Sequence, residues 1–307
     1  MDRLSAIEIF VAVVNQEGFT AAARQLDVSK SYVSKQVSRL EDRLGVRLLN
    51  RTTRHVSPTG EGEAFFERCA QILDDLEEAE RALTQAHSEP VGTLRLTAPM
   101  SFGQAYLAPA AADFMSEYPD LRVDIHFTDR LVDIIEEGFD LAVRVGSLQD
   151  SSLIVRRIAA ATGYAVAASS YLEAHGDPTH PEDLTDHACL LYSYLQTGAT
   201  WVFQNDDGEE ARVDIDGPMR ANNGEALLEA CKRGLGIYVA PDFITADAIR
   251  SDEVRRVLPD WHQDPGGIWA LYPHRRHLST KVRLFVDFLS DRFSDPPPWS
   301  LERTAES

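Results

Sequence analysis

The sequence predicts an α/β body preceded by an all-α head and a long connecting helix. Apolar residues recur at helical spacing within residues 4–44, an a/d heptad pattern runs through residues 65–86, and strand and helix patterns alternate through residues 94–293. The length of 307 residues suits roughly two domains, and 44% apolar and 26% charged residues are ordinary values for a globular protein. These values exclude a disordered chain and a small disulfide-stapled fold.

The head, residues 1–58, is predicted to begin with two short helices. Apolar residues at helical spacing predict the first helix, which ends at Gly18; they are Leu4, Ile7, Phe10, Val11 and Val14. A second helix is predicted over Ala21–Leu26 with Thr20 as its N-cap, because Ser and Thr side chains accept hydrogen bonds from the first free backbone N–H groups. A short turn at Asp27–Val28 follows it.

A third helix is predicted over Lys30–Leu44, between an N-cap at Ser29 and a C-cap at Gly45. Its apolar face is expected to point inward and contains Tyr32, Val33, Val37, Leu40 and Leu44. Its N-terminal end is polar and basic. Two helices joined by a tight turn, the second with such an end, form a helix-turn-helix, whose recognition helix contacts base edges in the major groove through its N-terminal residues.

Residues 46–58 predict a basic hairpin, or wing, after this motif. Arg47–Leu49 and His55–Ser57 are short strand-like pieces, and they flank Asn50–Arg54 with its two arginines. The negative potential of the minor groove favours Arg. We therefore expect the wing to contact the DNA backbone or the adjacent minor groove.

Charge is distributed unevenly along the chain. The net charge of −19 argues, taken alone, against binding a polyanion such as DNA. Residues 1–58 nevertheless carry nine Lys and Arg against six Asp and Glu, whereas residues 59–88 carry two against eight. A basic head on an acidic body predicts that only the head contacts DNA, although an acidic body can equally serve solubility.

Several motifs of the head closely resemble the signature of the LysR-type transcriptional regulators. They are Phe10–Val14, Phe19–Ala23, Val28–Val37, Leu40–Arg54 and Thr59–Gly62. The resemblance is nearly continuous through the head and extends, more weakly, over almost the whole chain. It implies a sequence-specific winged helix-turn-helix regulator, with a small-molecule effector bound between the lobes of a C-terminal domain similar to the periplasmic binding-protein fold.

The motif and the resemblance together single out candidate DNA-binding residues in the third helix and the wing: Ser29, Lys30, Ser31, Ser34, Lys35, Arg39, Arg51, Thr53 and Arg54. Lys35 departs from the family, whose members commonly carry Arg there. Because Lys lacks the planar fork with which Arg binds guanine, base readout at this position is expected to be looser or different. The alternative, that Lys30 and Lys35 are only solvated surface charges, would be favoured if they stood alone.

Residues 59–87 predict one long helix that pairs with its copy in a second chain. They contain no Pro and no Gly after Gly62, and apolar residues alternate at spacings of four and three: Phe65, Cys69, Ile72, Leu76, Ala79, Leu83 and Ala86. Such a homodimer would place two recognition helices on one double-stranded DNA, at an interrupted inverted repeat, and the resemblance favours a homotetramer. The alternative is an amphipathic helix that packs on its own chain. Residues 88–92 have the composition of a hinge.

The body, residues 93–295, is predicted to form lobe I from residues 93–162 and 267–295 and lobe II from residues 163–266. Strands are predicted at Leu94–Leu96, Leu121–Phe127, Leu141–Val145, Leu190–Tyr194, Thr200–Gln204, Val213–Asp216, Ile237–Ala240 and Ile268–Tyr272. Helices are predicted at Phe102–Tyr118, Leu131–Glu137, Pro181–His187, Gly224–Lys232, Phe243–Ile249 and Thr280–Phe293. The alternation of the first three strands with the two helices between them predicts a parallel sheet with right-handed crossovers. Residues 296–307 begin with three prolines and are expected to be disordered.

A cleft between two such lobes is a natural small-molecule site, and ligands collect at the carboxyl ends of parallel strands. This rule selects Ser101, Thr128 with Asp129, Arg144, and Asn222 with Asn223. Ser101 and Asn222 would lie near helix N-termini, which favour anions, and Arg144 would add positive charge. The resemblance implies effector contacts at Ser101, Thr128, Phe203 and Asn222. Each residue also has an ordinary structural explanation. Ser101 can be a helix cap and Thr128 an ordinary strand end. Arg144 can be a salt-bridge partner, and Phe203 can be part of the core.

No motif in the sequence supports catalysis. The chain has no Gly-x-Ser-x-Gly, no His-Glu-x-x-His and no phosphate-binding glycine loop, so we expect no enzyme, no cofactor and no metal site. Three widely spaced cysteines indicate free thiols in a reducing compartment, and a redox pair of Cys189 and Cys231 is disfavoured. With no signal peptide and no apolar run of ~20 residues, the protein is expected to be cytoplasmic, without a membrane partner.

Two other interpretations stay open at this point. One is a binding module without sequence-specific DNA function, which would keep all its activity without residues 1–87. The other is a small-molecule enzyme built on the two lobes, which would turn over whatever it binds. Salt-sensitive binding to duplex DNA separates a regulator from both.

Overall fold

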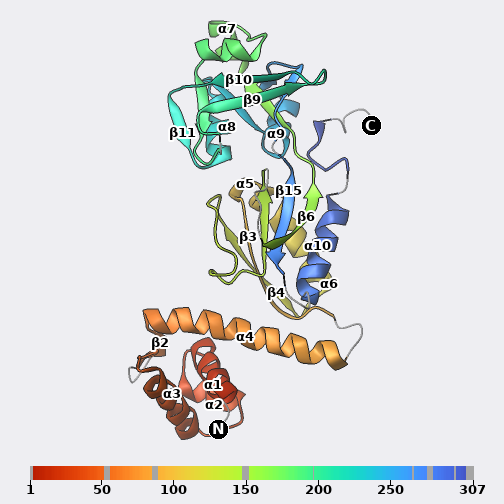
Figure 1. The fold of residues 1–307 in the computed structure, drawn as a ribbon. Helices are drawn as coiled ribbons and strands as arrows, with labels where there is room; N and C mark the ends of the chain where they lie inside the picture. The colour runs from red at the N-terminus through yellow and green to blue at the C-terminus, as the bar shows by residue number, and fades with distance from the viewer. Residues whose placement is uncertain are drawn as a thin grey trace. The chain divides into compact units, whose positions relative to one another are not determined.

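The computed structural model describes residues 3–51, 56–84, 89–146, 152–195, 197–264, 266–274, 279–293 and 295–301. The chain forms two compact units, Met1–Glu89 and Pro90–Ser307 (Figure 1). Within the ranges described, no helix combines the length and the apolar character that crossing a membrane requires.

The N-terminal unit is a helical head with a hairpin and a long helix. Its elements are α1 (Arg3–Asn15), α2 (Phe19–Gln25), α3 (Lys30–Leu44), β1 (Leu49–Arg51), β2 (Val56–Pro58) and α4 (Gly60–Thr84). β1 and β2 pair antiparallel, with Asn50 opposite Ser57. The fully buried side chains of Phe10, Val13 and Val33 lie in its core. The winged helix-turn-helix predicted from the sequence is confirmed.

Local signals place both ends of α3 where the sequence predicts them. Ser29 Oγ accepts a hydrogen bond from the backbone N–H of Tyr32 (3.2 Å), and Gly45 ends the helix with a φ of +71°. Because both caps are local, α3 begins and ends independently of what it packs against.

Two expectations for the head are wrong. α2 follows Gly18 and has no side-chain cap; Phe19 joins the helix and packs on the core, so Thr20 is not the N-cap. Tyr32 is 39% exposed because it lies one position off the buried stripe of α3, and Leu44, the last residue of the helix, is 38% exposed. That stripe consists of Val33, Val37 and Leu40.

The first turns of α4 pack on the head of their own chain. Cys69 is 2% exposed within the head core, and the Phe65 ring lies 5.6 Å from that of Phe10. The prediction that the whole seam faces a second chain is therefore wrong for Phe65 and Cys69, which complete the small core of the head. Ile72, by contrast, is 53% exposed. Ala86 and the side chains of Ala79 and Leu83 lie outside the described residues.

The first sheet of the C-terminal unit is mixed: its first three strands are parallel, as predicted, and a later strand joins them antiparallel. Its strands are β3 (Gly92–Ala98), β4 (Leu121–Phe127), β5 (Leu141–Val145), β6 (Leu153–Ala159) and β15 (Ile268–Pro273), in the order β4-β3-β5-β15-β6. β3 pairs parallel with β4 and β5, whereas β15 pairs antiparallel with β5 and β6. The antiparallel strand is the one that the chain adds last, after completing the other sheets of this unit.

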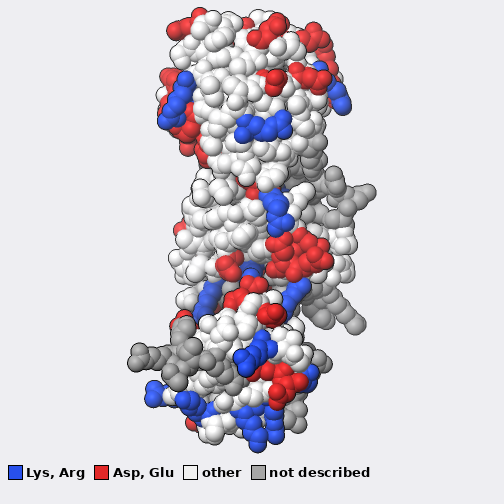
Figure 2. Space-filling view, turned by 90° about the vertical axis from the view of Figure 1, so that its left-hand side faces the viewer, with Lys and Arg blue, Asp and Glu red and all other residues white. Residues whose placement is uncertain are grey.

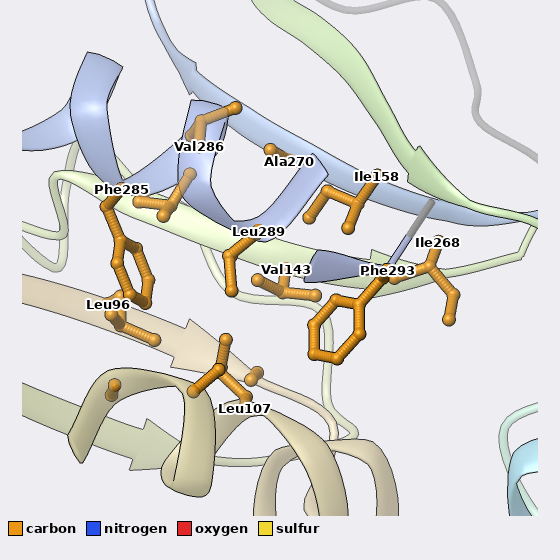
Figure 3. Packing of buried hydrophobic residues seen from close by; sticks show 14 of the residues in the cluster. Leu96, Leu107, Val143, Ile158, Ile268, Ala270, Phe285, Val286, Leu289 and Phe293 are labelled. Atoms are coloured by element: carbon orange, nitrogen blue, oxygen red, sulfur yellow. The ribbon is translucent and has the colours of Figure 1, made fainter. Parts of the chain in front are cut away.

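Helices cover one face of this sheet and form its main core. They are α5 (Met100–Phe102), the π-helical turn η1 (Gly103–Leu107), α6 (Ala108–Glu117) and α10 (Thr280–Arg292). Figure 3 shows side chains of the helices meeting those of the strands; the fully buried ones include Leu107, Phe285, Leu289, Leu96, Val143 and Ala270. We call the mixed sheet and these helices lobe I.

The remaining strands form two further sheets, which with their helices we call lobe II. β7 (Gly163–Ala167), β8 (Cys189–Tyr192), β11 (Met219–Ala221), β12 (Ile237–Pro241) and β13 (Arg255–Arg256) pair in the order β11-β8-β12-β7-β13. β9 (Thr200–Asn205), β10 (Glu210–Asp214) and β14 (Trp261–His262) pair in the order β10-β9-β14. The helices are α7 (Ser169–His175), the 3-10 turn η2 (Pro181–Asp186), α8 (Gly224–Lys232) and α9 (Asp242–Arg250). The sequence patterns do not predict α7 and β11.

Two further expectations for the C-terminal unit are wrong. Residues 131–137 form no helix: Asp133 Oδ1 accepts the backbone N–H groups of Ile135 and Glu136 (2.9 Å each) in the manner of an N-cap, but residues 134–138 form only turns. Residues 296–301 are ordered, since Trp299 is fully buried in the core of lobe I. Residues 302–307 lie outside the described part of the chain.

Candidate functional sites

α3 presents a polar and basic surface at its N-terminal end. Val33, Gln36 and Val37 form its buried side. The predicted DNA contacts lie elsewhere on the helix: Ser29, Lys30, Ser31, Lys35 and Arg39 are exposed and Ser34 is half-buried. Figure 2 shows Lys and Arg side chains gathered at the lower end of the N-terminal unit.

The cations of α3 are uncompensated. Within the described residues, Lys30, Lys35 and Arg39 form no ion pair. Exposed, unpaired cations suit a phosphate backbone, because binding then displaces counterions without breaking a salt bridge. Ser29 has a different role, since its hydroxyl caps α3 and lies 3.0 Å from Ser31 Oγ. Ser29 therefore positions the end of the helix that the other candidates share.

The start of the wing is held between α3 and α4. Glu41 Oε1 accepts the backbone N–H groups of Leu48 (3.0 Å) and Leu49 (3.1 Å). On the other side, the Thr59 N–H donates to Leu48 O (2.9 Å), and Thr59 Oγ1 donates to Arg47 O (2.8 Å). We call residues 47–49 with these bonds the wing joint.

Sequence reasoning missed the residues that build the wing joint. Thr59 Oγ1 also accepts the N–H of Gly62 (2.9 Å), an N-cap pattern of Thr before a helix that could have identified it. Glu41 carried no such signal, because its partners are backbone groups outside the helix. Of the predicted wing contacts, Arg51 pairs through its backbone with Val56, whereas the Arg51 side chain, Thr53 and Arg54 lie outside the described residues.

In the C-terminal unit, several candidates meet where lobe I contacts lobe II. Asn223 Nδ2 of lobe II donates to Met100 Sδ of lobe I (3.3 Å), and the Met100 N–H donates to Asp129 Oδ1 (3.1 Å). Asp129 also interacts with Tyr192 of lobe II. We call this region the inter-lobe junction.

Two hydroxyl groups converge on Gly224, the first residue of α8. Ser101 Oγ and Tyr238 Oη lie 3.4 Å and 3.2 Å from the point that a Cβ at Gly224 would occupy. Ser101 is 8% exposed, and its hydroxyl has no hydrogen-bond partner among the residues that the structure describes. Asn223 Oδ1 caps α8 by accepting the N–H of Ala226 (2.9 Å). The junction thus brings a hydroxyl of lobe I to the N-terminus of a lobe II helix.

Asn222, the candidate next to this cap, is exposed. Its neighbour Asn223 makes both the capping bond and the contact to lobe I. The sequence predicts that Asn222 and Asn223 precede a helix. It does not show which of the two caps it, because Asn in either position can cap a helix that starts here.

The side chain of Arg144 on β5 bonds to the turn that follows β4, which contains Thr128. Arg144 is 9% exposed, and its guanidinium donates to the carbonyl oxygens of Thr128 (3.3 Å) and Arg130 (3.4 Å). Burial lowers the pKa of Arg144, and the Asp129 carboxylate opposes that shift; burial likewise raises the pKa of Asp129, opposed by the Met100 N–H and by Arg144. Arg144 therefore holds this turn together and does not present a free charge, contrary to the prediction.

Phe203 does not belong to the inter-lobe junction. It is fully buried in the core of lobe II, with its ring 6.3 Å from that of Trp201. The prediction of an effector contact at Phe203 is wrong. Both rings lie on the same face of β9, as strand alternation requires, and they pack in the core.

The cysteines are buried and unreactive. Burial raises the pKa of Cys189 and of Cys231 to about 12 and also raises that of Cys69. Because the thiolate is the reactive form, these groups are poor nucleophiles at neutral pH. Nor does the described part of the chain bring together three His, Cys, Asp or Glu side chains that could hold a metal ion.

Comparison with known proteins finds the same two-part organisation. Residues 4–63 match the model of the bacterial regulatory helix-turn-helix protein, lysR family, and residues 87–294 match that of the LysR substrate binding domain. The chain is 40% identical over 282 residues to an uncharacterized HTH-type transcriptional regulator of Haemophilus influenzae, covering 92% of this chain and 98% of that protein. It is 35% identical over 301 residues to the HTH-type transcriptional regulator DmlR of Escherichia coli, covering 97% of each.

A solved structure shares the fold over almost its full length. CrgA, a LysR-type transcriptional regulator from Neisseria meningitidis, is similar with a TM-score of 0.59 and 33% sequence identity. The similarity covers 95% of this chain and 99% of that one.

Proposed function

This chain belongs to the LysR-type transcriptional regulators, which are DNA-binding proteins with an effector-binding domain, and from that premise we propose how it reads DNA and senses its effector. The family consists of regulators and not of enzymes, which excludes the alternative of a small-molecule enzyme built on the two lobes. LysR regulators are multimers that bind DNA and small molecules. The observation that carries the proposal is the exposed, uncompensated basic end of α3.

In the proposed complex, the N-terminal end of α3 enters the major groove. Lys30, Ser31, Ser34 and Lys35 contact bases and phosphates, and Arg39 contacts the backbone beside them. The wing, through Arg51, Thr53 and Arg54, reaches the backbone or the adjacent minor groove. Exposure of the α3 residues and the cap at Ser29 support this assignment. The protein acts in the cytoplasm, where a bacterial regulator meets its operator.

Two copies of the chain bind an interrupted inverted repeat as a homodimer, and dimers associate into a homotetramer. Ile72 on α4 supports the pairing, because it is 53% exposed whereas Phe65 and Cys69 pack in the head. The Ile72 position of the seam is therefore available to a second chain.

A selection from random duplexes with the full-length protein at near-physiological salt tests the DNA-binding proposal. We expect enrichment of an interrupted inverted repeat. Lys35→Ala and Ser34→Ala should each weaken binding to that repeat, Lys35→Ala by about 5- to 150-fold, since a good base contact is worth ~1–3 kcal/mol. Lys35→Arg should shift the preference toward guanine at one position of each half-site.

Arg212→Ala is the matched control for these variants. Arg212 is an exposed cation of β10 that pairs with Glu210, in the unit that does not bind DNA in this proposal, so its loss should leave the affinity unchanged. The proposal fails if a folded protein enriches no sequence, or if Lys35→Ala and Arg212→Ala bind the repeat equally well.

For the effector, we propose a small molecule with a carboxylate or similar anionic acceptor, bound at the inter-lobe junction. Ser101 Oγ donates to the acceptor, and the N-terminus of α8 stabilises its charge, with Thr128 and Asn222 at the edge of the site. The position of the Ser101 hydroxyl beside Gly224, at the N-terminus of α8, supports this location. Arg144 contributes indirectly, by holding the turn at residues 128–130.

A panel of small mono- and dicarboxylates, with their neutral amides, tests this site through the affinity for the selected operator. We expect at least one carboxylate to change the affinity of the wild type, and Ser101→Ala to require about tenfold more of it, because a hydrogen bond to a charged group is lost. The control Ser116→Ala removes an exposed hydroxyl of α6 that bonds only Ala112 O. Equal responses of Ser101→Ala and wild type, or a response to the amides alone, would contradict the proposal.

A further inference from the structure

The C-terminal strap, residues 295–301, packs on both lobes. The Trp299 ring is fully buried and lies 4.7 Å from the ring of Tyr106 and 5.6 Å from that of Phe102, both in lobe I. The same ring lies 6.2 Å from that of Phe243 on α9 of lobe II. The Trp299 ring therefore packs between helices of the two lobes, where Phe243 also lies 5.5 Å from Phe102 in the same core.

Hydrogen bonds tie the strap to the same places. Trp299 Nε1 donates to Ala160 O (3.3 Å), in the connection between β6 and β7. From α9, Arg250 Nη2 donates to the carbonyl oxygens of Trp299 (3.3 Å) and Ser300 (3.0 Å). Asp247 accepts from Arg250 Nη1 (2.9 Å), which orients the guanidinium. Both strap carbonyls thus accept from a side chain of lobe II.

The chain crosses between the lobes at residues 160–162 and again at residues 263–267, and the two crossings are joined. Gly163 and Gln263 exchange backbone hydrogen bonds, each 2.8 Å long. Thr162 O accepts the N–H of Asp242, the first residue of α9 (2.8 Å). Two adjacent crossings between two lobes form a hinge, about which the lobes can rotate where few other bonds resist.

We propose that the C-terminal strap is a latch on this hinge. Rotation of the lobes moves α9 relative to lobe I, and the strap resists that movement because it bonds α9 through Arg250 and the first crossing through Trp299. A ligand that requires another lobe orientation has to break these bonds. The effector must therefore bind that orientation more tightly than the latched one, by at least the free energy of the bonds that it breaks. In this respect the latch rests on the effector role proposed for the inter-lobe junction.

Hydrogen exchange at single amides of the full-length protein tests the latch. Arg250→Ala is expected to raise the exchange rates of the Gly163 and Gln263 amides by about tenfold, because the two bonds that join α9 to the strap come from a charged group and are lost. The amides of Leu96 and Val143 in the lobe I sheet should keep their wild-type rates. Trp299→Phe keeps an aromatic ring but loses the bond to Ala160 O, and a smaller rise is expected.

Arg233→Ala is the matched control, since Arg233 is an exposed arginine of α8 that pairs with Glu229 and lies outside the strap contacts. It should leave all four amides at their wild-type rates. Unchanged rates at Gly163 and Gln263 in both strap variants overturn the latch, and so does an equal rise at Leu96 and Val143, which would indicate general destabilisation. The measurement needs neither DNA nor effector, so its failure is distinct from a failure of the proposed function.

Discussion

Replacing Lys281 by methionine is expected to lower the free energy of unfolding of the C-terminal unit by about 3–5 kcal/mol. Lys281 on α10 and Asp140 are each 4% exposed, with Nζ 3.2 Å from Oδ2. Nζ also donates to Thr93 O (2.6 Å), and the same Asp140 oxygen accepts the N–H of Arg95 (3.0 Å). Methionine preserves the apolar stem but leaves a buried carboxylate without its counter-charge.

Urea unfolding followed by tryptophan fluorescence measures this loss. The tryptophans of the chain, Trp201, Trp261, Trp269 and Trp299, all belong to the C-terminal unit, so the signal reports its unfolding. Arg212→Met breaks an exposed pair and should cost less than about 1 kcal/mol. The double variant Asp140→Asn with Lys281→Met should lose less than Lys281→Met alone, since the amide is neutral and still accepts from Arg95. A wild-type midpoint for Lys281→Met would refute the assignment.

Gly62→Ala is expected to destabilise the head by about 3 kcal/mol or more and to reduce operator binding accordingly. A Cβ at Gly62 would lie 1.9 Å from Leu48 O and 2.8 Å from Leu48 C. Both are backbone atoms of the wing joint, which Glu41 and Thr59 hold in place, so no side chain can rotate to relieve the clash. Either α4 or the start of the wing has to move.

Gly60→Ala provides the comparison for this variant. Gly60 begins the same helix, and a Cβ there would have no atom within 4 Å. Circular dichroism at increasing temperature and operator affinity should distinguish the two variants, with Gly60→Ala close to wild type. If Gly62→Ala melts and binds like Gly60→Ala, the close approach of α4 to Leu48 is incorrect.

The head was predictable from sequence because its signals are local. Ser29 and Gly45 bound α3 through contacts with neighbouring residues, and the hydrophobic period selects Val33 and Val37 as core. The prediction placed Tyr32 on the buried face of α3 because its ring is largely apolar, although it lies one position before Val33 in the hydrophobic period. Where a cap had to compete with packing, as at Thr20, the packing of Phe19 prevailed.

The C-terminal unit was less predictable, because its important contacts join distant parts of the chain. Asp140 and Lys281 carry no mutual signal in the sequence, and neither do Ser101 and Gly224. The prolines near Trp299 indicated disorder by composition, yet one large aromatic ring buries enough apolar surface to order the strap. Alternation predicted the parallel order of β3, β4 and β5, but it does not reveal that β15, placed in lobe I from the sequence, enters the sheet antiparallel.

The wing joint has a consequence for how a signal can reach DNA. Because residues 47–49 are bonded to α3 on one side and to the start of α4 on the other, a rotation of α4 carries the recognition helix and the wing with it as one rigid body. In the proposed complex with an inverted repeat, each head would then read the same half-site in every state of the protein. The states would differ in the distance and the helical phase between the two heads. We therefore expect the response at an operator to depend more on the length of its spacer than on the base sequence of its half-sites.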